Sequence, residues 1–147
     1  MRADDELAAF DRAFMLANRL SGAMGQALAE RGLNTARAEV LYVLQNQGEM
    51  VQRQLSQWLH CTPRHVTTLI DTLADMDLVE RKPHPTDRRA VLVALTEHGR
   101  AVSGALDTQR RTAASAILGD ATDAELRSFI SVADRIAAGI GARQSSR

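Results

Sequence analysis

The spacing of apolar residues changes abruptly in the middle of the chain. Before residue 78 apolar residues recur every three or four positions, as on one face of a helix, whereas residues 90–95 alternate with a period of two. One element cannot follow both periods, so the change marks a boundary between helices and a short sheet. The sequence therefore predicts a mainly α-helical fold with a small β-hairpin.

Three helices are predicted before this boundary, over residues 35–47, 51–60 and 62–77. Asn34 can cap the first helix, and Gly48 can end it. Thr62 is a favourable N-cap for the third helix, because Pro63 then takes the first helical position, where its missing N–H costs nothing. Asp77 is expected to close this helix, since aspartate tolerates a left-handed backbone. The predicted buried side of the third helix is Val66, Leu69, Ile70 and Leu73.

Two short strands are predicted next, at residues 78–82 and 90–95, and the second should place Val91, Val93 and Leu95 on one face. Their linker, Pro-His-Pro-Thr-Asp-Arg-Arg, is too long for a tight turn, and its two prolines stiffen it into a projecting loop. Four basic residues and one acid fall within residues 81–89, although the formal net charge of the chain is zero. Contact with a nucleic acid would therefore depend on local placement and not on a basic surface.

Long amphipathic helices flank this middle region. Residues 4–31 would form a helix of about 42 Å, which a small globule cannot cover from one side. After a cap at Thr96, a helix should run to about Leu118, and Thr122 and Glu125 form a capping box for the last helix. The apolar stripes of these helices need a partner. The sequence therefore divides into residues 1–33, residues 34–96 and residues 97–147.

Composition narrows the class of protein. Apolar residues make up 45% of the chain and aromatic residues only 3%, which is typical of a globular protein with an aliphatic core. The acidic N-terminus and the absence of a long apolar run indicate a soluble, cytoplasmic protein without a membrane partner. His60, Cys61 and His65 lack a third ligand at a metal-like spacing and an orienting acid, so we expect no metal, no cofactor and no enzyme activity.

Two helices joined by a tight turn and followed by a hairpin form a winged helix-turn-helix. Residues 54–101, QLSQWLHCTPRHVTTLIDTLADMDLVERKPHPTDRRAVLVALTEHGRA, resemble the MarR family of bacterial transcription regulators. The most specific part is Asp87-x-Arg89, followed by alternating apolar residues, Leu95-Thr96 and Gly99-Arg100. The resemblance implies a homodimeric repressor that binds a pseudo-palindromic operator in double-stranded DNA. The expected domains are then residues 1–33 and 97–147 for dimerisation and residues 34–96 for DNA binding. It also implies release by a small effector, often phenolic or aromatic.

The exposed side of the third helix would face the major groove. Arg64 can bind a guanine edge or a phosphate, and threonines suit phosphates, base edges or thymine methyl groups. The resemblance implies that Arg89 enters the minor groove with Asp87 as its orienting partner, while Arg88 binds a phosphate. Without DNA binding, the exposed side of the third helix would be an ordinary solvated helix face, and Asp87 and Arg89 would form an ordinary surface salt bridge. The predicted DNA-binding residues are Thr62, Arg64, His65, Thr67, Thr68, Arg88 and Arg89, with Asp87 orienting the wing.

Two functional alternatives stay open at this point. The even charge balance is compatible with a dimeric winged-helix module that binds another protein and not DNA. Cys61 lies at a predicted helix N-terminus, where a thiolate is favoured, so it could sense oxidants. Its position in the turn instead favours a small buried hydrophobe, and we expect packing to be its role.

Overall fold

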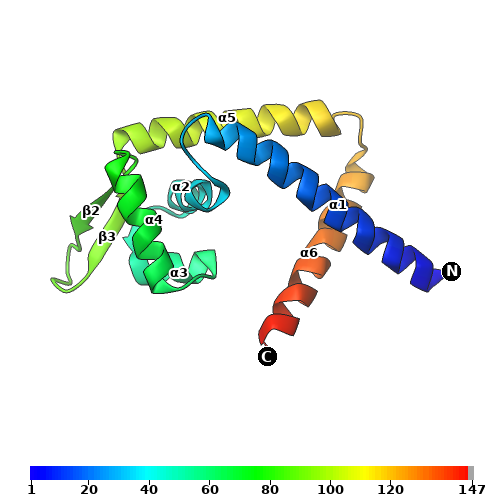
Figure 1. Cartoon of the computed structure of the whole chain (residues 1–147), viewed down its shortest axis with the longest axis horizontal. Coiled ribbons are helices and arrows are strands. Elements are labelled where there is room, and N and C mark those ends of the chain that lie inside the picture. The colour runs from blue at the N-terminus through cyan, green and yellow to red at the C-terminus, as the bar shows by residue number, and fades with distance from the viewer. Residues whose placement is uncertain (146–147) are drawn as a thin grey trace. The chain divides into compact units, whose positions relative to one another are not determined.

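Six helices and three strands make up residues 1–145, the part of the chain that the computed structural model describes (Figure 1). In chain order they are α1 (Arg2–Ala29), α2 (Thr35–Gln47), β1 (Met50–Val51), α3 (Gln52–Leu59), α4 (Pro63–Asp75), β2 (Val79–Pro83), β3 (Val91–Leu95), α5 (Glu97–Leu118) and α6 (Asp123–Ser145). The predicted fold class is confirmed. None of the described helices is long and apolar enough to cross a membrane.

The chain divides into two units, which are described separately. The central unit is residues 18–109, and the terminal unit combines residues 1–17 with the chain from residue 110 onward. All buried hydrophobic side chains of the described chain lie in the central unit. Its aliphatic core draws mainly on α2, α3, α4 and the sheet, with Leu41, Leu55, Ile70 and Leu73 among its fully buried members.

Local capping sets the helix ends in the central unit, as predicted. The Asn34 side chain accepts a hydrogen bond from the Arg37 N–H (2.9 Å), and Gly48 ends α2 at φ 84°. Thr62 Oγ1 accepts from the His65 N–H at the start of α4 (3.2 Å). The buried side of α4 consists of the four predicted residues. Asp77 follows the helix in the predicted left-handed conformation, at φ 57°.

The sheet has three strands in the order β1-β3-β2, all antiparallel. The sequence analysis missed β1, whose two residues are too few to show a period. Because β3 is the middle strand, Leu92 through Leu95 are all buried, whereas Val91 is 45% exposed. Strand β3 places Val91, Val93 and Leu95 on one face, as predicted, but Val91 at the start of the strand is exposed. A strand covered on both faces shows no alternation of burial.

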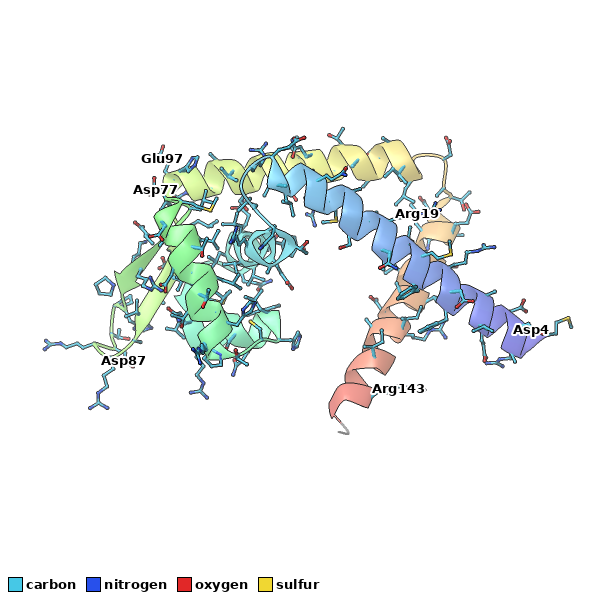
Figure 2. All side chains as sticks on the ribbon, in the orientation of Figure 1. Asp4, Arg19, Asp77, Asp87, Glu97 and Arg143 are labelled. Carbon is cyan, nitrogen blue, oxygen red and sulfur yellow. The ribbon has the colours of Figure 1, made fainter. Side chains whose placement is uncertain are left out.

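The start of α5 is locked against the turn before β2. Thr96 Oγ1 accepts from the Gly99 N–H (2.9 Å), which confirms Thr96 as the cap, and donates to the Asp77 carbonyl (2.5 Å). A Cβ on Gly99 would lie 1.9 Å from the Leu78 carbonyl oxygen, so only glycine permits this approach. Figure 2 shows Asp77 and Glu97 together at this junction. The junction fixes where β2 begins.

The terminal unit has a well-capped helix but no core of its own. Thr122 and Glu125 form the predicted capping box: the Thr122 N–H donates to Glu125 Oε2 (2.8 Å), and the Glu125 N–H donates to Thr122 Oγ1 (3.3 Å). Hydrogen bonds from Thr122 hold the pKa of Glu125 below its usual value. No side chain of residues 1–17 or 110–143 is buried. Besides Met1, the terminal unit exposes the large hydrophobic residues Leu7, Phe10, Phe14, Met15, Leu16, Ile117, Leu118, Phe129, Ile130, Val132 and Ile140.

Candidate nucleic-acid interface

Helix α4 lies between α3 and the hairpin of β2 and β3, and it contacts both α3 and β2 (Figure 1). The 13 residues of α4 span about 20 Å, and the five residues of β2 return over about 17 Å after a short turn. The N-terminus of α4 and the loop after β2 therefore lie toward the same side of the central unit. We call β2, β3 and this loop (residues 84–90) the wing.

The side chains predicted to bind DNA are exposed on these two elements. Thr62, Arg64, His65, Thr67 and Thr68 lie in the first half of α4 or at its cap, and Arg88 and Arg89 lie in the wing loop. Figure 2 shows side chains extending from the loop beside Asp87. Within residues 1–143, no carboxylate lies within ion-pair distance of Arg64, Arg88 or Arg89. Their guanidinium groups are available to an external anion.

Two basic side chains of β2 are paired with carboxylates within the protein. Arg81 Nη2 donates to Asp71 Oδ1 (2.6 Å), which joins the wing to the exposed face of α4. Lys82 Nζ lies 3.2 Å from Glu49 Oε2. Pairing Asp71 removes a charge that would repel phosphates from α4. The positive charge left unpaired on this surface is therefore that of α4 and the wing loop.

A chain of hydrogen bonds continues from this ion pair to the first helix of the helix-turn-helix. Arg81 Nε donates to Gln52 Oε1 (3.4 Å), and Gln52 Nε2 donates to Thr67 Oγ1 (3.1 Å). The chain thus links α3, α4 and β2 through four side chains. The sequence analysis did not identify Gln52 or Arg81, because the paired residues lie 10 to 29 positions apart and no local pattern reports such a pair.

The threonines of α4 are less free than expected. The Thr67 hydroxyl donates to the Pro63 carbonyl (3.0 Å), and the Thr68 hydroxyl donates to the Arg64 carbonyl (3.2 Å). Such bonds to the carbonyl four residues earlier are common for threonine within helices. With its proton donated in this way, the Thr68 hydroxyl keeps both lone pairs, whereas the Thr67 hydroxyl, which also accepts from Gln52, keeps one.

Asp87 holds the main chain of Arg89 and not its side chain. Asp87 Oδ1 accepts from the Arg89 N–H (2.9 Å), the two-residue contact of an Asx turn. The sequence analysis expected Asp87 to orient the Arg89 side chain, but a short aspartate side chain reaches the amide two residues on more readily. Asp87 therefore fixes the backbone from which Arg89 projects.

The segment that carries this geometry matches a known domain. A family model described as a winged helix DNA-binding domain matches residues 33–99. Residues 33–99 are a winged helix domain. An uncharacterized HTH-type transcriptional regulator of Mycobacterium leprae is 36% identical over 67 residues, which cover 46% of this chain and 47% of that protein. The match thus spans about half the length of such curated relatives.

Solved structures extend the likeness beyond the winged helix domain. A MarR family regulator from Neisseria meningitidis has a TM-score of 0.70 at 22% identity, covering 94% of this chain and 97% of that one. The S. aureus MepR–DNA complex has a TM-score of 0.75 at 16% identity, covering 89% and 97%. The chain has the fold of the MarR family regulators, as the sequence resemblance implied.

Cys61, in the turn of the winged helix domain, is half-buried and packs against the core. Burial, followed by the nearby Glu39 carboxylate, raises the pKa of the Cys61 thiol. A raised pKa leaves less thiolate at neutral pH, so iodoacetamide should alkylate the native protein more slowly than the unfolded chain. Mass spectrometry of timed samples measures this rate. Faster alkylation of the folded protein would instead support a redox role for Cys61.

His60, Cys61 and His65 were considered as metal ligands in the sequence. Within residues 1–145, no three histidine, cysteine, aspartate or glutamate side chains gather as a metal site. His60 ends α3 in a left-handed conformation, and His65 lies in the first turn of α4. The chemistry of this surface is that of exposed arginines, a helix N-terminus and a stiff loop.

Proposed function

We propose that this protein is a transcription regulator of the MarR family that binds double-stranded DNA as a homodimer and acts as a repressor. The observation that carries the proposal is the charge pairing around α4 and the wing. Arg64, Arg88 and Arg89 are exposed without ion pairs in the described chain, whereas Asp71 and Glu49 are neutralised. The name of the M. leprae relative and the DNA bound in the MepR complex also support it.

In the proposed complex, the N-terminal turn of α4 enters the major groove. Arg64 and His65 lead this turn, and Arg64 suits a bidentate contact with a guanine. Thr62 caps the helix, whose N-terminal N–H groups favour a phosphate. Thr67 and Thr68 contribute acceptors and methyl groups, the latter suited to thymine.

The wing would lie along the neighbouring minor groove. A narrow minor groove concentrates negative potential and attracts an inserted arginine. Arg89 is assigned this role, because its backbone is held by Asp87. Arg88, next to it in the loop, is assigned to a phosphate.

Homodimerisation is supported by the terminal unit. Its helices carry large exposed hydrophobics such as Phe14 at 64% and Phe129 at 58% exposure, but no buried side chain in the described chain. Helices of this kind are stable when a second copy covers their apolar stripes. A two-fold dimer would place two α4 helices in successive major grooves, roughly 34–36 Å apart, on a pseudo-palindromic operator.

The proposal includes a small effector, often phenolic or aromatic in the family that the sequence resembles, that would change the spacing of the two wings. Purified protein on operator DNA tests this with a panel of small phenols, and release of the DNA at saturating phenol is the expected result. If the protein instead binds a partner protein irrespective of salt and of Arg89, the winged fold serves protein interaction and the repressor proposal fails.

Arg64→Ala tests whether α4 reads bases. A bidentate arginine–guanine contact discriminates against the wrong base by about 1–3 kcal/mol, so the variant should lose preference at one position of each half-site. Competition assays with single-base variants of the operator measure this preference. Arg19→Ala, which removes an exposed arginine on α1, is the matched control. An equal loss of affinity for every duplex would assign Arg64 to a phosphate.

A further inference from the structure

The histidine of the wing loop, His84, accepts two main-chain hydrogen bonds on one ring nitrogen. The N–H groups of Thr86 and Asp87 donate to His84 Nδ1 at 3.2 Å and 3.0 Å. The His84 N–H donates to the Ala90 carbonyl (3.3 Å), and the Ala90 N–H donates to the Asp87 carbonyl (3.2 Å). The half-buried imidazole thus lies at the base of the loop and holds its first turn.

These bonds connect the imidazole to Arg89. His84 Nδ1 binds the Asp87 N–H, and the Asp87 carboxylate binds the Arg89 N–H (2.9 Å). The His84 ring therefore holds the turn over residues 84–87, and the Asp87 carboxylate holds the next turn, over residues 87–89. Because both donors are N–H groups, Nδ1 must carry a lone pair, which requires the neutral ring with its proton on Nε2.

We propose that neutral His84 is a positioning residue that orders the wing tip, and that protonation of its ring loosens the tip and weakens the DNA contact of Arg89. The DNA part of this inference rests on the proposed function. Protonation puts a hydrogen on Nδ1, where it faces the Thr86 and Asp87 N–H groups; it can then be donated to the Thr86 hydroxyl oxygen, 3.4 Å away, but Nδ1 no longer accepts from either main-chain N–H. Both hydrogen bonds are then lost.

The charged groups around His84 belong to the wing. Lys82 on β2 pairs with Glu49, the Asp87 carboxylate is engaged by the Arg89 N–H, and Arg88 and Arg89 extend from the loop. A protonated histidine near phosphates would by charge alone strengthen DNA binding. The positioning role has the opposite sign, since it predicts weaker binding as the pH falls. The direction of the pH effect therefore separates the two roles.

His84→Asn is the informative variant. Asparagine Oδ1 is as many bonds from the backbone as histidine Nδ1, and it accepts N–H bonds without titrating. The variant should keep the loop ordered at every pH, whereas His84→Ala should lose the order at every pH. Other histidines, including His65 on α4, are unchanged in both variants. Their contribution to the pH dependence of binding therefore cancels when each variant is compared with the wild type.

The experiment measures fluorescence anisotropy of the duplex from upstream of the coding region with the full-length chain at constant ionic strength. Between about pH 7.5 and pH 5.5, wild-type affinity should fall about tenfold relative to His84→Asn, as expected for two lost hydrogen bonds. His84→Ala should already be weak at about pH 7.5. Identical pH profiles for wild type and His84→Asn, or a relative gain by the wild type, would overturn the proposal.

Nuclear magnetic resonance of the protein without DNA keeps the test separate from the proposed function. The ¹⁵N shift of His84 Nδ1 should be that of an unprotonated nitrogen at about pH 7.5, and the Thr86 and Asp87 amide signals should titrate together with it. A neutral ring protonated on Nδ1 would refute the inference. If this pattern holds but no duplex is bound, the DNA-binding proposal fails while the role of His84 in ordering the loop stands.

Discussion

Arg89→Ala is expected to weaken operator binding by roughly 10- to 100-fold, the equivalent of about 1.4–2.8 kcal/mol. The Arg89 side chain is exposed and pairs with no carboxylate in the described chain. Its removal should therefore leave the dimer and the unfolding temperature almost unchanged. Anisotropy titration measures the affinity, and thermal unfolding by circular dichroism measures the stability.

Arg88→Ala is the matched control for this prediction. A phosphate contact carries no sequence information, so the variant should weaken all duplexes evenly and reduce the slope of log affinity against log salt by about one. Arg89→Ala should instead lose most affinity where the minor groove is narrow. A fall in unfolding temperature of several degrees with Arg89→Ala would make this arginine structural and contradict its assigned role.

Phe129→Glu is expected to abolish the dimer. Phe129 lies on α6 and is 58% exposed in a unit without a buried side chain among its described residues. If a second copy covers this face, the substitution buries a carboxylate in an apolar interface, at a cost of several kcal/mol. Analytical ultracentrifugation should then find a 16.0 kDa species in place of one of twice that mass.

Trp58→Glu controls for the general effect of a new charge. Trp58 is 51% exposed and lies on α3 in the central unit. The Trp58→Glu variant should therefore keep the mass of the dimer. Operator binding by Phe129→Glu should fall with the dimer, since two half-sites can no longer be bound together. A dimer that persists in Phe129→Glu would remove α6 from the proposed interface.

Local signals predicted the helix boundaries well. Asn34, Thr62, Thr96 and Thr122 each cap a helix as expected, because a cap depends on a few neighbouring residues and their backbone amides. The left-handed conformation of Asp77 is local in the same sense. The period of apolar residues also identified the buried side of α4.

Contacts between distant residues were not predictable in this way. Gln52 meets Arg81 across 29 positions, and the two-residue strand β1 pairs with β3 through Met50–Val93 and Val51–Leu92. The mode of the Asp87–Arg89 contact was missed for a different reason. The spacing predicted that the two residues interact, but only the backbone conformation decides whether the amide or the guanidinium is the donor.

The zero net charge acquires a physical explanation from these contacts. Asp71 on α4 and Glu49 beside the wing are paired within the protein, so a few exposed arginines at fixed positions can face DNA without a basic surface. Affinity would then come from a small number of phosphate and groove contacts. A modest dependence on salt follows, since few counterions are released.

Binding of the duplex from upstream of the coding region, compared with a scrambled duplex of equal composition, tests the central claim most directly. Anisotropy titration at two salt concentrations should show one dimer per duplex. At physiological salt, it should also show a preference of about 10³-fold or more over the scrambled duplex. Equal affinity for the two duplexes, or no salt-sensitive binding at micromolar protein, would contradict sequence-specific DNA binding by this chain.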